Sequence, residues 1–290
     1  MRTVFRTAEL VAAYGRGAVR HAIATGRWQS PHRGVVVTHS GPLSPDEQEL
    51  VALTLCAPAS ALGGLSALRH DGFTGFASDS TFVVLPEGAA RPSVPSLVTH
   101  FSTDLGTADV HPFKEPRRTR AARSVIDAAS WCETDRYART IVLAAMQQGL
   151  VNAARLHQTL DRRGMCRRRG LIRESILDGT GGIQSLPERD FDDIRRAAGL
   201  PAPTRQRKIQ GPDGHYFLDA AWDAFAFSVE VHGTPHQEVA RWDADLLRGN
   251  EIVIGGRRLL IFSSYAIRHE PQLVTHQLTR MFLALGWRAA

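Results

Sequence analysis

The chain has 290 residues, of which 43% are hydrophobic and 22% are charged, and its formal net charge is +6 at pH 7. This length exceeds one ordinary compact core and suits two or three small domains of a soluble globular protein. The sequence has no run of about 18 apolar residues and no apolar signal-peptide core near its start, so we expect neither a membrane span nor a secretory leader.

The three cysteines, Cys56, Cys132 and Cys166, are far apart in the chain and odd in number. Such usage is typical of a reducing compartment, and it favours neither a disulfide framework nor a zinc site. We therefore expect a cytoplasmic protein.

Residues 1–40 are expected to form a small winged helix-turn-helix domain. The pattern predicts two short helices and a strand that closes a wing, at residues 8–14, 18–25 and 33–37. Arg16 and Arg20 are candidate contacts to a DNA phosphate backbone. The alternative is a small N-terminal cap that does not contact DNA, because helix-turn-helix motifs are also common packing modules.

Residues 41–115 are expected to form a small α/β domain. Ser44-Pro45-Asp46-Glu47 is a strong helix start, with a capping serine, proline at the first helical position and acids in the first turn. A second helix is predicted from Ala59 to Arg69, and strands are predicted at 81–85 and 96–102. No catalytic group of residues is expected in this region.

Residues 116–180 are expected to be helical and basic. Between Arg117 and Arg169 the sequence has twelve arginines and four acids, a local net charge of +8. Such a segment in a nearly neutral chain is typical of a phosphate-binding surface, although a solvated helical surface explains it too. The candidate DNA contacts at its end are Arg162, Arg163, Arg167, Arg168 and Arg169.

Residues 181–290 are predicted to contain both helices and strands. Arg205, Arg207 and Lys208 form an exposed basic strip that offers further DNA contacts. The predicted elements are a helix from Ser185 to about Ala198, a first strand ending at Leu218-Asp219-Ala220, a second strand at 225–232, a helix at 238–254, a strand at 258–262 and a helix at 271–287.

Two carboxylates, Asp219 and Glu230, stand in otherwise apolar strand sequence. A buried carboxylate without a partner is costly, and two that converge commonly hold a divalent cation such as Mg²⁺. Glu188 is a candidate third ligand from the preceding helix, and His232 a candidate general base, water-positioning group or phosphate contact. The alternative is a sheet with two solvated edge acids.

Four residues near these acids are candidate supporting groups. His236 offers a second imidazole, while Arg241 and Arg248 can bind phosphate or balance the acids. Asp243 is expected either to pair with Arg248 or to cap its helix locally.

The C-terminal stretch resembles the PD-(D/E)xK restriction-endonuclease superfamily, and more narrowly very-short-patch-repair-endonuclease-like domains. The first 115 residues resemble the AbiEi-type antitoxin architecture, a winged helix followed by a small α/β domain. The residues that carry the C-terminal resemblance are Ser185-Leu186-Pro187-Glu188, Ala198-Gly199-Leu200-Pro201, Leu218-Asp219-Ala220-Ala221-Trp222, Val229-Glu230-Val231-His232-Gly233, His236, Arg241-Trp242-Asp243-Ala244-Asp245, Arg248-Gly249-Asn250 and Arg258-Leu259-Leu260-Ile261-Phe262.

These resemblances imply a multi-domain α/β (α+β) chain that ends in a restriction-endonuclease-like mixed sheet flanked by helices. They imply Asp219 and Glu230 as the central metal-binding acids and Glu188 as the helix-borne one. His232 stands where the superfamily often has Lys and these relatives often have Asp, and Leu218 stands where the family has Pro. His232 is therefore the position that separates a nuclease from a domain that only binds.

The leading hypothesis is a DNA-binding protein with a Mg²⁺-dependent endonuclease-type domain that hydrolyses phosphodiester bonds. The alternative is a non-catalytic, antitoxin-like transcriptional regulator with a degenerate nuclease fold, which has a cognate toxin or a second copy of itself as partner. A third interpretation is a partner-binding protein whose basic helices serve assembly.

Overall fold

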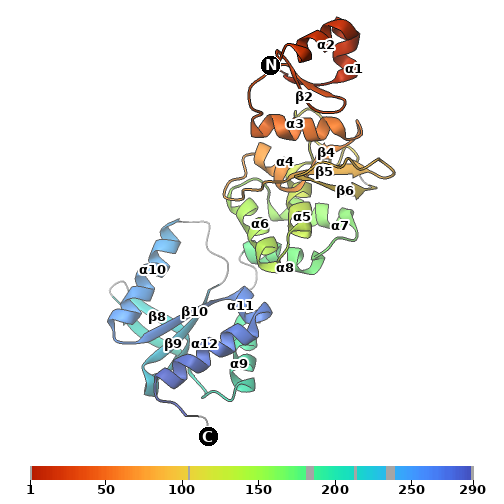
Figure 1. Cartoon of the computed structure of the whole chain (residues 1–290). Coiled ribbons are helices and arrows are strands. Elements are labelled where there is room, and N and C mark those ends of the chain that lie inside the picture. Colours follow the sequence, from red (N-terminus) through yellow and green to blue (C-terminus); the bar gives the residue numbers. More distant parts are fainter. Residues whose placement is uncertain (1, 104, 181–185, 212–213, 233–238, 289–290) are drawn as a thin grey trace. The chain divides into compact units, whose positions relative to one another are not determined.

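The computed structural model describes residues 2–103, 105–180, 186–211, 214–232 and 239–288; for 186–189, 205–218, 232 and 239–245 only the backbone is described. The chain divides into two compact units, Met1–Ile176 and Leu177–Ala290 (Figure 1). Helices and three small sheets make up these units, which confirms the mixed α/β class. Among the described helices, none has the length and apolar character needed to cross a bilayer.

The first unit begins with a three-stranded antiparallel sheet in the order β1-β3-β2, accompanied by two short helices. Leu10, Val19 and Val36 form one apolar cluster between the helices and the central strand. The two helices and the third strand agree with the predicted positions, whereas the first two strands were not predicted, because neither has the continuous run of β-branched residues found in β3. The elements are β1 (Val4–Arg6), α1 (Thr7–Tyr14), α2 (Arg16–Ala24), β2 (Gln29–His32) and β3 (Val35–Val37).

Helix α3 (Pro45–Leu55) begins where the sequence predicts. Ser44 Oγ accepts a hydrogen bond from the Glu47 backbone N–H at 3.3 Å, and the Glu47 carboxylate accepts one from the Ser44 N–H at 3.0 Å. This reciprocal pair satisfies donors that a helix start otherwise leaves without partners. On its inner side, Val51 packs against Val4, Val35 and Val37, so α3 covers the first sheet.

The second sheet has the order β4-β5-β6, with β5 parallel to β6 and antiparallel to β4. The predicted helix from Ala59 to Arg69 is wrong at its start, because Ala61 and Leu62 are extended and pair with β5. Glycines at 63 and 64 separate that strand from the helix. The elements are β4 (Ala61–Leu62), α4 (Gly64–His70), β5 (Thr81–Pro86) and β6 (Leu97–Ser102).

Trp131 explains why glycine is needed at 63 and 64. A Cβ at Gly63 would lie 2.6 Å from Val84 Cγ2, and one at Gly64, where φ is +52°, would lie 2.8 Å from Trp131 Cζ3. The other face of the indole stacks on His100, with ring centroids 3.8 Å apart. These contacts fix α4 and the sheet against the end of the next helix.

Four helices complete the first unit, and α5 lies at their centre, with nine of its eleven residues buried. Its apolar face packs with Ile141, Leu156, Ile172 and Ile176 in one core. The first three helices agree with the helices that the sequence predicts at 119–131, 135–148 and 152–163. The four helices are α5 (Ala121–Trp131), α6 (Asp135–Gln147), α7 (Ala153–Arg163) and α8 (Arg169–Gly179).

The second unit is built on a four-stranded sheet in the order β10-β9-β8-β7. The three consecutive strands β7, β8 and β9 are antiparallel, whereas β10 runs parallel to β9 after the α10 crossover. The elements are α9 (Leu186–Ala197), β7 (Thr204–Gly211), β8 (Gly214–Trp222), β9 (Phe227–His232), α10 (Val239–Ile254), β10 (Arg258–Ser263), α11 (Ser264–His269) and α12 (Pro271–Ala284).

One prediction about this unit is incomplete. The basic stretch 205–208, which the sequence did not predict as a strand, is part of β7, which pairs with β8 along almost its whole length. Its alternating Arg, Gln and Lys residues give no apolar pattern, so the sequence did not reveal a strand. The final helix predicted at 271–287 is confirmed as α12, whereas the short helix α11 before it was not predicted.

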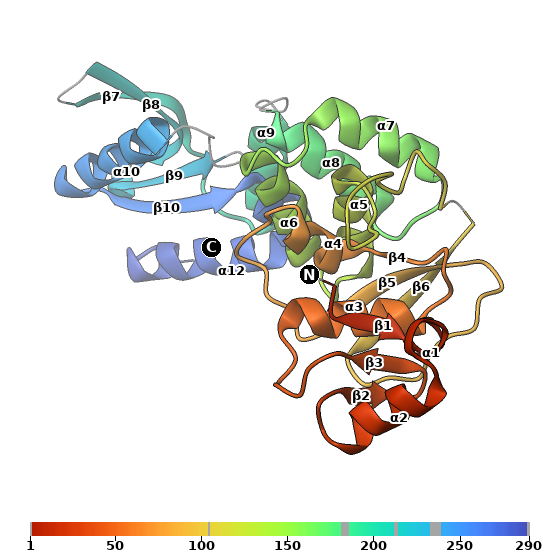
Figure 2. The ribbon, with the colours of Figure 1, turned by 90° about the horizontal axis from the view of Figure 1, so that it is seen from above.

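An aromatic cluster on α12 holds the β8–β9 hairpin. The Phe282 ring lies 5.2 Å from Trp222 and 5.5 Å from both Phe225 and Phe227, measured between centroids. Helices α10 and α12 lie on opposite faces of the sheet (Figure 2). Since residues alternate between faces along a strand, the side chains next to this apolar cluster in sequence face α10.

Candidate functional site

Asp219 and Glu230 come from neighbouring strands. The β8–β9 pairing places Ala220 opposite Val229, and the two acids are the next residues on their strands. Ala220 and Val229 pack in the core on the α12 side, so Asp219 and Glu230 face α10. The sheet thus brings the two predicted acids to adjacent positions on one face.

The two carboxylates differ in environment. Glu230 is only 3% exposed, whereas Asp219 on the neighbouring strand is exposed to solvent. Asp219 Oδ2 accepts a hydrogen bond from the Val231 backbone N–H at 2.8 Å. A carboxylate that accepts a backbone N–H is held in one orientation and favours its ionised form.

Arg248 on α10 lies against the buried acid. Its Nη2 donates to Glu230 Oε2 at 2.8 Å, and its side chain is 28% exposed. This pair balances a buried negative charge, which would be costly alone. A divalent cation at Glu230 therefore has to share the carboxylate with Arg248 or displace it.

Several predicted site residues are described only in their backbone or lie outside the described residues. Glu188 is on α9, His232 ends β9, and Arg241 and Asp243 are on α10. His236 lies outside the described residues. Of the predicted metal and supporting groups, the side chains described are those of Asp219, Glu230 and Arg248, and among them Arg248 and Glu230 form an ion pair. The backbone alone is known for the basic strand residues Arg205, Arg207 and Lys208.

The predicted phosphate-binding arginines at the end of the helical region have structural partners. Arg168 donates to the carbonyl oxygens of Cys132 and Glu133 at 2.8 and 2.9 Å and to Asp135 Oδ1 at 2.7 Å. The carbonyls at a helix C-terminus lack intrahelical partners, so a guanidinium there acts as a cap. Arg168 thus ties the end of α5 to the start of α6.

Three of its neighbours are also engaged within the fold. Arg162 binds Asp109 at 2.7 Å, Arg163 binds Asp127 at 3.4 Å, and Arg169 donates to the Gly164 carbonyl at 2.6 Å. Besides Arg162, three of the predicted DNA contacts are exposed, namely Arg16, Arg20 and Arg167. Within the described part of the chain, no hydrogen bond or ion pair holds these three side chains. They are therefore the best placed to meet a phosphate backbone.

A buried charge network accounts for much of the basic segment. Arg123, 1% exposed, binds Asp127 at 2.7 Å and Asp109 at 3.3 Å. Burial raises the pKa of Asp127, and the charges of Arg123 and Arg163 oppose that shift. Sequence patterns did not predict this network, because Asp109 lies outside the arginine-rich segment.

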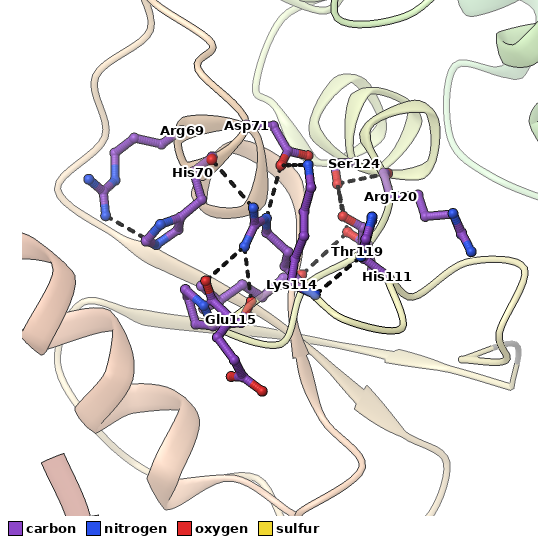
Figure 3. A network of polar contacts seen from close by, with 12 residues as sticks. Arg69, His70, Asp71, His111, Lys114, Glu115, Thr119, Arg120 and Ser124 are labelled. Atoms are coloured by element: carbon purple, nitrogen blue, oxygen red, sulfur yellow. Dashed lines mark hydrogen bonds and ion pairs between the residues drawn. The ribbon is translucent and has the colours of Figure 1, made fainter. Parts of the chain in front are cut away.

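Asp71 is a second acid that lies outside residues 117–169 in the sequence but pairs with an arginine of that segment in the fold. It accepts from Lys114 Nζ at 2.9 Å and from Arg118 Nε at 3.0 Å (Figure 3). Arg118 is itself buried and also donates to the Glu115 and Pro116 carbonyls at 3.2 Å. This side chain therefore organises the loop before α5.

A cavity of about 590 Å³ lies beside Asp71 in the first unit, between the starts of α5 and α7. Its lining includes Lys114, Arg120, Arg155 and Arg162. The sequence analysis did not identify this cavity. The high density of arginine was the available signal, but it did not show which of these side chains converge.

One further group has a composition suited to a metal. Oxygen or nitrogen atoms of Asp46, Glu49 and His70 lie within 4.8 Å of one another. Arg69 Nη2 occupies the same place, at 2.6 Å from Asp46 Oδ1 and 2.7 Å from Glu49 Oε2. Burial would raise the pKa of Glu49, but the hydrogen bonds from His70 and Arg69 prevail and lower it. The guanidinium already supplies the positive charge here.

Comparison with known proteins identifies no family for this chain. Neither a scan against protein-family models nor a search of curated proteins finds a match to the chain.

Proposed function

We propose that this is a DNA-binding protein whose second unit hydrolyses phosphodiester bonds at a Mg²⁺ site formed by Asp219 and Glu230. The observation that carries the proposal is the placement of these two acids on adjacent strands, on one face of the sheet. Glu230 is buried there, although burial of a carboxylate is unfavourable unless it serves a partner. The restriction-endonuclease resemblance supports the same two residues.

The donor set fits the metal. Mg²⁺ prefers hard oxygen ligands and takes few carboxylates, since it retains several waters. When bound, Mg²⁺ polarises the phosphate and lowers the pKa of the attacking water. Glu188 is the proposed third ligand, and His232 is the proposed proton acceptor or water-positioning group. Asp219 is oriented for this role by the Val231 N–H.

DNA binding is proposed for the cations that the fold leaves exposed. Arg16 and Arg20 on α2 and Arg167 before α8 have no partner in the described chain. Residues 205, 207 and 208 add a basic strand at the edge of the second unit's sheet. Contacts of this kind release counterions, so the affinity for DNA is expected to fall steeply as the salt concentration rises. The cytoplasm is the compartment that suits this substrate.

The ion pair between Arg248 and Glu230 favours one alternative. A guanidinium on a buried carboxylate can supply the positive charge that a metal would supply, and Arg69 pairs in a similar way with Glu49 and Asp46. In that case the second unit is a degenerate nuclease fold, and the protein is a non-catalytic, antitoxin-like regulator. Its partners would then be DNA together with a cognate toxin or a second copy of the chain.

Nicking of supercoiled plasmid in Mg²⁺ tests the proposal. We expect wild type to nick DNA in Mg²⁺ but not in EDTA, and Asp219→Asn/Glu230→Gln to lose activity by about 100-fold or more. Glu251→Gln removes an exposed acid from α10 and serves as the matched control. Equal cutting by wild type and the double variant would refute the catalytic role. Salt-sensitive DNA binding without any cutting would select the regulator instead.

A further inference from the structure

The cavity in the first unit has an unusual balance of charge. Five basic side chains and one acidic side chain line it, the basic ones being Lys114, Arg120, Arg123, Arg155 and Arg162. Its volume of about 590 Å³ is within the range typical of small-molecule sites. A cavity of this size and charge is suited to an organic anion.

The carboxylates around the cavity do not neutralise its cations. Three acids, Asp71, Asp109 and Asp127, pair with five cations, namely Lys114, Arg118, Arg123, Arg162 and Arg163. Arg120 and Arg155 are not among them. Within the described part of the chain, each donates only to a neutral oxygen, Arg120 to the Thr107 carbonyl at 3.2 Å and Arg155 to Gln158 Oε1 at 3.2 Å.

The backbone adds to this positive character. Arg120 is the residue before α5, and its side chain makes no capping hydrogen bond to the helix. The first N–H groups of a helix carry a partial positive charge and attract anions. The start of α7 differs, because Asn152 Oδ1 accepts from the Arg155 N–H at 2.9 Å. An anion bound at the N-terminus of α5 is therefore stabilised more than one bound at the N-terminus of α7.

His111 lies in the same positive electrostatic potential. Its Nδ1 accepts hydrogen bonds from the backbone N–H groups of Phe113 and Lys114 at 3.3 and 3.2 Å, which assigns the proton of the neutral ring to Nε2. Burial and the charges of Lys114, Arg120 and Arg118 lower the pKa of His111. Burial disfavours a charge of either sign, but the three neighbouring cations disfavour only a further cation, and their field favours an anion.

One wall of the cavity is apolar. The apolar residues of the lining include Ala121, Ala122, Leu150 and Val151. Among the described residues, Asp71 is the one carboxylate in the lining of this cavity. We propose that the cavity binds an organic phosphate of nucleotide size, with the phosphate held by Arg120 and Arg155 and the remainder against Leu150 and Val151. This site lies in the first unit and does not depend on the metal site proposed for the second. The phosphate can belong to a free nucleotide or to the end of a nucleic-acid strand.

Calorimetry on the full chain in EDTA tests the site. The probes are adenosine 5′-monophosphate, adenosine, and a single-stranded oligonucleotide with and without a 5′-phosphate. We expect adenosine 5′-monophosphate to bind and adenosine not to bind. Arg120→Gln/Arg155→Gln is expected to weaken binding at least tenfold, because two charge-assisted hydrogen bonds are lost. Tighter binding of the 5′-phosphorylated strand identifies a strand end as the ligand, and tighter binding of the monophosphate identifies a free nucleotide.

The control variant is Arg33→Gln/Arg280→Gln, which removes two exposed positive charges that are not part of the cavity lining. It is expected to bind the probes as wild type does. Equal weakening by both double variants, or no binding by wild type at millimolar probe, overturns the proposal. Arg155→Glu is a second variant with little risk to folding, since Arg155 contacts only Gln158 one turn along α7. Because EDTA removes divalent metal, failure here is separate from failure of the nuclease proposal.

Discussion

Arg248 Nη2 donates to Glu230 Oε2 at 2.8 Å, so a fixed cation on α10 meets the buried acid of β9. The two functions proposed for the second unit assign different roles to this ion pair. In a metal-dependent nuclease the arginine competes with Mg²⁺, whereas in a regulator it permanently replaces the metal. Removing the arginine alone distinguishes these roles.

Arg248→Met is expected to lower the free energy of unfolding by about 3 kcal/mol in EDTA, because it removes the guanidinium that pairs with the buried Glu230 carboxylate. If Glu230 is a metal ligand, added Mg²⁺ restores much of this loss, since a ligand that binds the native state stabilises it. Thermal unfolding with and without Mg²⁺ measures both effects.

The control for this experiment is Arg248→Met/Glu230→Gln, which removes both charges together. We expect its stability to exceed that of the single variant and to be independent of Mg²⁺. A single variant that Mg²⁺ does not stabilise would argue for the regulator and against the metal site.

Arg123→Met is expected to destabilise the first unit by about 3–5 kcal/mol, because Asp109 and Asp127 would keep their buried charges with less compensation. Urea denaturation followed by circular dichroism measures the loss. Arg167→Met removes an exposed arginine nearby and is expected to change stability by less than about 0.5 kcal/mol. Similar losses in the two variants would show that the buried network contributes little.

Glu47→Gln tests the acid dependence of stability. Hydrogen bonds from Thr3, the Ser44 N–H and His39 lower the pKa of Glu47 to about 2. A lowered carboxyl pKa stabilises the native state above the unfolded value near 4.5, and this contribution is lost as the pH falls toward 2. We expect the variant to lose about 2 kcal/mol at pH 7 and to show a flatter stability profile between pH 4.5 and 2. Glu87→Gln, at an exposed acid, should keep the wild-type profile.

His100→Phe tests a second acidic transition. Burial and the charge of Arg91 lower the pKa of His100 to about 4. The unfolded chain takes up the proton near pH 6.5 while the native state resists it, so stability is lost as the pH falls from 6.5 toward 4. Phenylalanine retains a ring against Trp131 and has no proton to bind. A variant whose stability falls between pH 6.5 and 4 as steeply as that of wild type would contradict this account.

The sequence predicted the parts of the fold that local chemistry determines. The Ser44–Glu47 capping pair located α3, and apolar periodicity located α5, α6 and α7. Local patterns failed where pairing decides the structure. Strand β7 has no apolar alternation, and Ala61 and Leu62 are extended because β5 offers them partners.

The candidate sites show the same limit. The sequence predicted that Asp219 and Glu230 share one sheet, but the partner of Glu230 on α10 comes from the tertiary fold. Counting charges along the chain gave the 117–169 segment a large excess of arginine. Asp71 and Asp109 reduce that excess in space, although both lie outside the segment. Among the described cations that line the cavity, Arg120 and Arg155 are the two that pair with no carboxylate.

The glycine pair beside Trp131 has a consequence for relatives of this chain. Every single-base change of a glycine codon to another amino acid introduces a Cβ, and a Cβ at position 64 meets the indole at 2.8 Å. Positions 63, 64 and 131 are therefore expected to vary together across species rather than one at a time. A homologue with alanine at 64 should carry a smaller side chain at 131, which makes this trio a marker of common descent that any collection of related sequences can check.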